Sequence, residues 1–315
     1  MFSPTLSKRL LIAILALALA ARLWGIRYGL PWLFYFHDEP QVVLRALRFG
    51  TGDLDPHFFI WPATPLLYLA FLSYVSLFAF GRVTGLWSGK SGFAAAYFRD
   101  PSIFYILPRL HSVAFGVWGV WLANGAVTAA YGTPVGIATA LGLAVNALHA
   151  HYSHFAHPVT AMTAFTLLGL WAAVRLAQDG GRRELTLGAV AIGVGTSCQY
   201  HAALLVVPLG VAVLLRAARE PGHASTWLVR GLVMGLAGVG LFLLIAPYTL
   251  LDYATFRADL AWITAKTSGT ATGPPPGALA GLDTYVRACL VPGLGAPLAI
   301  AAALGALLAL VRRTR

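Results

Sequence analysis

Charged residues are scarce in this chain. Of its 315 residues only 10% are charged and 58% are hydrophobic, whereas a soluble domain carries about 25% charged and about 45–50% apolar residues. This shortage excludes a water-soluble enzyme and a disordered tail. Cysteine is scarce as well: Cys198 and Cys289 lie in or beside apolar stretches. They predict neither a disulfide framework nor a cysteine zinc site.

The chain contains long apolar runs. They lie near residues 10–33, 61–85, 106–130, 134–150, 159–178, 185–218, 228–247 and 288–311. About 20 such residues form a helix that crosses a ~30 Å hydrocarbon core, so the sequence predicts an all-α, polytopic integral membrane protein. The 185–218 run is too long for one crossing. It is interrupted by Ser197-Cys198-Gln199-Tyr200-His201, where we expect two crossings to join.

The first run begins with Lys8 and Arg9 and contains Ala18-Leu19-Ala20, which resembles a signal-peptidase site. Because apolar residues resume through Leu30, beyond that tripeptide, we expect an uncleaved first span.

The 61–85 run decides the side on which every later loop lies. Pro62 and Pro65 restrict its firmly apolar part to about residues 65–80, a length that suits a helix in the membrane interface. If 61–85 does not cross, the basic residues beyond residue 130 gather mostly on the cytoplasmic side, as the positive-inside rule requires. If it crosses, that distribution is inverted. We therefore expect a juxtamembrane helix here.

The resulting topology is a single module over residues 1–315 with about eight crossings and both termini in the cytoplasm. Residues 31–105 form a first extracytoplasmic loop with juxtamembrane helices, and 248–287 form a later one whose Gly273-Pro274-Pro275-Pro276-Gly277 run is typical of a lid. The formal net charge of +11 then reflects topology in a lipid bilayer and not a nucleic-acid partner. We expect this bilayer to be a bacterial inner membrane.

The polar clusters all fall on the outer side in this topology, which favours an active site over a scaffold. A transporter is an alternative, but the charges lie mostly at the ends of spans, not at mid-membrane depth, and the sequence has no internal repeat.

Just past the first span the chain reads His37-Asp38-Glu39-Pro40. One interpretation is a helix start, with an acidic cap and Pro40 in an early position. The other is that one carboxylate is a general base. The two are compatible, because adjacent residues at a helix start point in different directions.

These residues and several later segments resemble the C-type (GT-C) membrane glycosyltransferases, in particular the protein O-mannosyltransferase and aminoarabinose-transferase group. The later segments, in chain order, are Gly52-Asp53-Leu54-Asp55-Pro56-His57-Phe58, Pro108-Arg109-Leu110-His111-Ser112, Asn146-Ala147-Leu148-His149, Tyr152-Ser153-His154-Phe155-Ala156, Gly195-Thr196-Ser197-Cys198-Gln199-Tyr200-His201-Ala202-Ala203 and Pro247-Tyr248-Thr249-Leu250-Leu251-Asp252-Tyr253.

The resemblance implies inverting transfer of a sugar from a polyprenyl-phosphate carrier to an acceptor hydroxyl of a protein, lipid or polysaccharide. It implies Asp38 as the base, with Glu39 as its assistant or as a helix cap. Donors must then stabilise the leaving phosphate. The expected phosphate-side residues are Arg109, Gln199, Tyr200 and His201, and the expected cavity residues are His37, His149, His154, Asp252 and Arg257. Arg109 could instead snorkel at a span end, and Asp252 could cap a helix.

Two departures from the family pattern leave an alternative open. Val159 stands where related sequences usually hold an aspartate, and Gln199 where they usually hold a lysine. Relatives also generally have more spans. A degenerate, non-catalytic subunit that binds a lipid carrier or a partner protein is therefore the second hypothesis.

No cofactor is expected to be required, since a carrier with a single phosphate bears little charge. A divalent metal is the lesser alternative. The histidines of the second outer loop could ligate zinc or manganese, but the spacing of His149, His151, His154 and His157 matches no strong metal motif.

Overall fold

The structure, a computed structural model, describes residues 3–32, 36–267 and 277–312. It is 82% helical, and the described residues contain no strand. The predicted all-α fold is confirmed. The predicted lid, Gly273 to Pro276, lies outside the described residues.

The first half of the chain forms α1 (Pro4–Leu23), α2 (Glu39–Arg48), η1 (Phe49–Thr51), α3 (Thr64–Val83), α4 (Lys90–Arg99), α5 (Ser102–Tyr131), α6 (Thr133–Ala144) and α7 (Ala147–Ser153). The second half forms α8 (Val159–Gln178), α9 (Arg182–Cys198), η2 (Tyr200–Leu205), α10 (Val206–Arg219), η3 (Pro221–His223), α11 (Ala224–Ile245), α12 (Tyr248–Leu251), α13 (Tyr253–Thr267), α14 (Ala278–Tyr285), η4 (Val286–Leu290), α15 (Val291–Leu294) and α16 (Ala296–Arg312).

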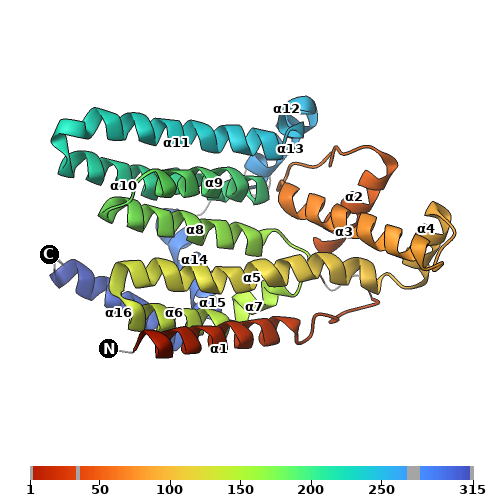
Figure 1. The fold of residues 1–315 in the computed structure, drawn as a ribbon, viewed down its shortest axis with the longest axis horizontal. Helices are drawn as coiled ribbons and strands as arrows, with labels where there is room; N and C mark the ends of the chain where they lie inside the picture. The colour runs from red at the N-terminus through yellow and green to blue at the C-terminus, as the bar shows by residue number, and fades with distance from the viewer. Residues whose placement is uncertain (1–2, 33–35, 268–276, 313–315) are drawn as a thin grey trace.

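Most of these helices form one bundle with two distinct ends (Figure 1). The end that carries α2, α3, α4 and α12 is called the loop end here. At the other end α1 begins, α16 ends, and α8 connects to α9. This basic end holds Arg175, Arg182, Arg183, Arg216 and Arg219. Arg216 and Arg219 donate hydrogen bonds there to the carbonyls of Gln178 and Ala177.

The bundle core lies among α5, α8, α9, α10 and α11. Leu122, Leu176 and Leu209 are fully buried in it. Glycine allows α9 to approach α11 closely, because a Cβ added to Gly193 would lie 2.7 Å from the Gly238 carbonyl oxygen. Small residues at such crossings are typical of helices packed within a membrane.

Five helical segments are long and apolar enough to cross a membrane, or up to seven if two bent pairs each count as one span. A polytopic membrane protein is thus confirmed, while the expected number of about eight is not. The predicted helix break at 197–201 is present, because α9 ends at Cys198 and a new helix begins at Tyr200, but α9 is not among the segments that meet the criteria for a span.

Three predicted spans have different limits or shapes. α1 ends at Leu23 and not near residue 33, because Gly25 and Gly29 adopt positive φ angles that end a helix. The run at 134–150 is broken into α6 and α7 with a 58° bend, and the last run bends by 111° before α16.

Arg22 stabilises the bend between α6 and α7. It is fully buried, and its guanidinium donates to the Ala144 carbonyl (3.1 Å) and the Leu143 carbonyl (3.3 Å). Both carbonyls belong to the last turn of α6, where carbonyls lack partners within the helix; the Leu143 carbonyl also accepts from the Asn146 N–H at 3.4 Å. Its Nη2 also lies 2.7 Å from Nδ1 of His149.

α3 passes the length and apolarity criteria for a span, but it lies past the loop end of α8 and α9 (Figure 1). It packs beside the first turns of α5, where Tyr74 donates to the Phe104 carbonyl (2.6 Å) and Ser73 lies 2.8 Å from His111. α5 has 30 residues and is about 45 Å long, longer than a ~30 Å core. Its surplus length is the part that α3 covers.

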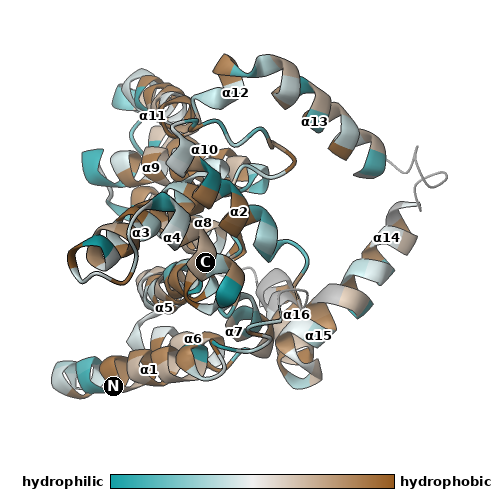
Figure 2. Cartoon of the chain, turned by 90° about the vertical axis from the view of Figure 1, so that its right-hand side faces the viewer, coloured by the Kyte–Doolittle hydropathy of each residue, from teal (hydrophilic) through white to brown (hydrophobic). Residues whose placement is uncertain are grey.

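Viewed from the loop end, α13 and α14 extend away from the bundle (Figure 2). α13 contacts the first loop where the Phe59 N–H donates to Asp259 Oδ2 at 2.6 Å and the Phe59 ring packs edge-on against Phe256. This contact joins two segments that the sequence places in separate outer loops.

Candidate active site

The acidic pair at the start of α2 divides into a buried and a partly exposed carboxylate. Glu39 is 2% exposed and accepts hydrogen bonds from Arg109 Nε (2.7 Å), Arg109 Nη2 (2.6 Å) and the Ala156 N–H (2.8 Å). This two-pronged ion pair fixes the start of α2 against α5 and the segment before α8. Glu39 therefore positions the helix and does not face a substrate cavity.

Arg109 does not lie where the phosphate of a lipid carrier could reach it. It is 2% exposed, and its Nη1 donates to the carbonyls of Ile26 (2.7 Å) and Tyr28 (2.9 Å), while its other nitrogens bind Glu39. The expectation that Arg109 grips phosphate does not agree with this placement. The alternative of a snorkelling arginine does not describe it either, since the guanidinium is internal.

Asp38 occupies the N-cap position of α2, but its side chain makes no capping hydrogen bond. Its carboxylate is 32% exposed and lies 3.5 Å from His37 Nε2 and 3.7 Å from His157 Nε2. The adjacent Pro40 takes the early helical position that the sequence predicts. Asp38 thus keeps an accessible carboxylate at the loop end.

His157 forms the inner wall beside Asp38. It is 7% exposed and packs against the rings of Phe36 and Trp61, with centroids 5.4 and 5.5 Å away. Its Nδ1 accepts from the Val159 N–H at 3.4 Å, so Nε2 is assigned the proton and points at Asp38. Burial lowers the pKa of His157 to about 4, which keeps the ring neutral at pH 7.

The other histidines of this region point in different directions. His149 lies against Arg22, and His154 Nε2 lies 3.2 Å from the Ala21 carbonyl. The sequence does not indicate that His149 or His154 lies close to α1. His37 is exposed, with 89% of its side chain accessible. Among the described residues these histidines do not gather around one point.

The break at 197–201 reaches the loop end as expected. The Ala63 N–H donates to the Cys198 carbonyl (3.1 Å) at the start of α3. Tyr200 donates to the Phe59 carbonyl (2.7 Å), while His201 is exposed and Gln199 is half-buried. Segment 59–63 is therefore fastened to the break at both ends.

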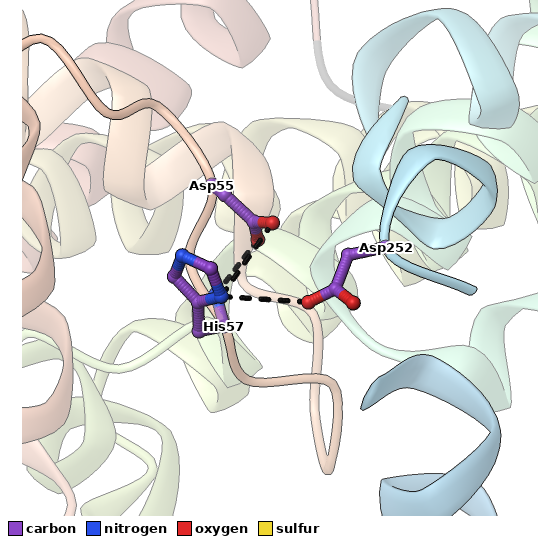
Figure 3. A group of neighbouring side chains, drawn as sticks. All are labelled: Asp55, His57 and Asp252. Carbon is purple, nitrogen blue, oxygen red and sulfur yellow. Dashed lines mark hydrogen bonds and ion pairs between the residues drawn. The ribbon is translucent and has the colours of Figure 1, made fainter. Parts of the chain in front are cut away.

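A second group of side chains joins the first loop to α12 (Figure 3). His57 Nδ1 lies 3.6 Å from Asp55 Oδ2 and 3.4 Å from Asp252 Oδ2. One ligand atom from each of these three residues lies within 4.8 Å of the others, close enough to hold a metal ion. Arg257, five residues further on, is exposed.

The two carboxylates of this group and the neighbouring Asp53 have perturbed pKa values. The N–H of Asp55, with Arg48 and His57, lowers the pKa of Asp53 to about 2. Burial raises the pKa of Asp55, and hydrogen bonding by Thr255 lowers that of Asp252.

A separate, apolar cavity is also present. It has a volume of about 680 Å³ between α2, α3, α4 and the start of α5, and Lys90 is the charged residue among those that line it. Asp38, His157 and His57 do not line it. The chemistry-bearing groups therefore lie outside this cavity, although both are at the loop end.

Residues 102–251 match the model of the dolichyl-phosphate-mannose-protein mannosyltransferase family. The resemblance that the motifs indicate is thereby confirmed over this range, from α5 to α12. No match was found among curated proteins or among solved structures.

The match covers 150 of the 315 residues, slightly less than half of the chain. The matched range includes Arg109, His157 and the 197–201 break. Asp38 and Glu39 precede it, so their roles rest on geometry and on the motif resemblance.

Three residues of the site cannot be identified from the sequence alone. His157 is one of several histidines in its segment, and only its contact with Asp38 distinguishes it. Asp55 and His57 stand in an alternating Asp53-Leu54-Asp55-Pro56-His57 pattern. That spacing is a usable signal for side chains on one side of an extended segment, but their partner, Asp252, is distant in the chain.

Proposed function

We propose that this protein transfers a sugar from a polyprenyl-phosphate carrier to an acceptor hydroxyl, with Asp38 as the general base. The observation that carries the proposal is the division of the acidic pair. The carboxylate of Glu39 is occupied by the buried ion pair with Arg109. Asp38, at the same helix start, is partly exposed and makes no capping hydrogen bond.

The proposed step is a single inverting displacement. The Asp38 carboxylate accepts the proton of the acceptor hydroxyl as its oxygen attacks the anomeric carbon. The bond between that carbon and the phosphate oxygen breaks, and the lipid phosphate leaves with the bonding electrons. A positioned base of this kind contributes about 10²–10⁴-fold to the rate. The neutral His157 lies beside the carboxylate, with its Nε2 3.7 Å from Oδ2.

The leaving phosphate needs donors where negative charge grows. Since Arg109 is internal, His201 and Arg257 are the proposed donors, because both are exposed near the loop end. Gln199 and Tyr200 line that side. The step itself requires no metal, since a single phosphate bears little charge.

The loop end is proposed to face the extracytoplasmic side of a bacterial inner membrane. Support comes from the arginines of the basic end, which the positive-inside rule places in the cytoplasm with both termini. Further support is the position of α3 beyond the bundle (Figure 1), which suits a juxtamembrane helix and not a crossing.

The sugar and the acceptor stay open, the latter among protein, lipid and polysaccharide. The alternative is a non-catalytic, carrier-binding or partner-binding membrane subunit. Val159, Gln199 and the internal position of Arg109 favour it, because each removes a charge from the expected site.

Incubation of the purified protein with labelled polyprenyl-phosphate sugars separates the two. Extracted membranes supply acceptors, and products are resolved by chromatography. Labelled product supports the enzyme. Saturable binding of the carrier without transfer to any acceptor class supports the alternative.

A further inference from the structure

His57 lies at the centre of three carboxylates from two distant parts of the chain. Its Nε2 lies 3.1 Å from Asp53 Oδ2, and its Nδ1 faces Asp55 and Asp252 at 3.6 and 3.4 Å. The last two contacts meet at one nitrogen, which carries at most one proton. A single hydrogen bond therefore cannot satisfy both carboxylates.

The separations are those of ligands around a small divalent ion. Ligand atoms at about 2.0–2.2 Å from a tetrahedral Zn²⁺ lie about 3.3–3.6 Å from each other. The two distances from Nδ1 fall at this spacing. They exceed the usual length of a hydrogen bond to a charged group, about 2.7–2.9 Å.

The other partners of these carboxylates bind the oxygens that do not face Nδ1; Oδ1 of Asp252 accepts from the Thr255 N–H at 3.4 Å. Oδ2 of Asp252 is fully buried and has no hydrogen-bond partner among the described residues. Asp55 is 7% exposed, and its hydrogen bond from the His57 N–H occupies Oδ1, the oxygen that does not face Nδ1. Arg48 pairs with Asp53, not with these two. A buried carboxylate that faces a second one, whose side chain is only 20% exposed, is costly without a cation.

The outer contacts orient the imidazole for a metal. Asp53 holds Nε2 and is itself held by Arg48 at 2.6 Å, which is the carboxylate–histidine arrangement found behind metal-binding histidines. His57 adopts a φ of 45°, a left-handed conformation that persists when its surroundings enforce it.

We infer that Asp55, His57 and Asp252 bind one divalent transition-metal ion, Zn²⁺ by its preference for mixed nitrogen and oxygen ligands, with a fourth position open to water. The ion joins the first loop to the segment after α11. It acts as a clamp on the loop end, so the inference does not depend on Asp38 being a base.

The test is metal binding by the full-length protein in detergent. The protein is stripped with EDTA, dialysed and titrated with Co²⁺, whose visible absorption reports a tetrahedral site. Zn²⁺ is then added as competitor, and bound metal is counted by mass spectrometry. We expect one Co²⁺ per chain, displaced by Zn²⁺, and a higher thermal midpoint with Zn²⁺ than with EDTA.

Three variants locate the site. Asp252→Asn and His57→Asn remove a ligand; asparagine suits position 57 because it tolerates positive φ. Both are expected to abolish the absorption. Asp53→Asn leaves the ligands and weakens affinity about 10–100-fold. Asp283→Asn, at an exposed ion pair on α14, is the matched control and binds as the parent does.

Binding below one ion per two chains, or full binding by a monodisperse Asp252→Asn protein, overturns the inference. So does a thermal midpoint that EDTA and Zn²⁺ leave equal in the parent protein. Because these readouts need no sugar transfer, an inactive protein that binds Co²⁺ supports the clamp while failing as an enzyme.

Discussion

Replacing Glu39 by glutamine tests whether the acidic pair is divided between structure and chemistry. The carboxylate accepts three buried hydrogen bonds, two of them from Arg109. Glutamine keeps one acceptor oxygen but turns an amide N–H₂ toward a guanidinium nitrogen. The buried charge of Arg109 is left without a counterion. Breaking a buried pair in this way costs about 3–5 kcal/mol.

The cost is measurable as a shift of the thermal midpoint. For a chain of this size each kcal/mol corresponds to about 1.5 °C, so Glu39→Gln should lower the midpoint in detergent by about 5–8 °C. Asp38→Asn, one residue away, should leave it nearly unchanged, because the Asp38 side chain makes no capping bond. The double variant Glu39→Gln/Arg109→Met should recover part of the loss, since it removes both charges.

Equal midpoints for Glu39→Gln and the parent protein would refute the buried ion pair. A loss in Asp38→Asn as large as that in Glu39→Gln would refute the division of roles. The double-variant cycle keeps the test informative if Glu39→Gln alone fails to fold.

Two further predictions concern buried basic groups. The pKa of His157 is about 4 in the folded protein against an ordinary 6.5. As the pH falls, the unfolded chain therefore takes up this proton at a higher pH than the folded protein does. The free energy of unfolding has its full value above pH 6.5 and falls by about 3 kcal/mol toward pH 4. Thermal scans of His157→Gln should lose most of this pH dependence. Scans of the exposed His37→Gln should keep it. Arg22→Ala should cost about 1–3 kcal/mol, because the Ala144 carbonyl at the end of α6 loses its donor. Arg27→Ala, an exposed control, should stay within about 0.5 kcal/mol of the parent in the same scans.

The sequence predicts the helical membrane fold because apolar runs of span length have few other uses. It predicts the 197–201 join because a polar break in a run too long for one span must be a turn. The end of α1 is harder, since apolar residues continue past Leu23 and only the backbone of Gly25 and Gly29 ends the helix.

The site is predictable in its location but not in its contacts. The sequence indicates that the polar clusters meet at one end, and the contacts of segment 59–63 with Cys198, Tyr200 and Asp259 bear out that these segments meet. It does not indicate that Glu39 and Arg109, 70 residues apart, cancel each other's charge. Nor does it bring Asp252 to His57, because side-chain pairing across loops depends on how the helices pack.

The central claim is that Asp38 is the carboxylate that takes the acceptor proton. The most direct test is the rate of sugar transfer by Asp38→Asn protein whose thermal midpoint equals that of the parent, with a saturating labelled polyprenyl-phosphate sugar. The account predicts a loss of at least about 100-fold, the contribution of a positioned base, with carrier binding retained. Turnover within a few-fold of the parent rate would contradict it.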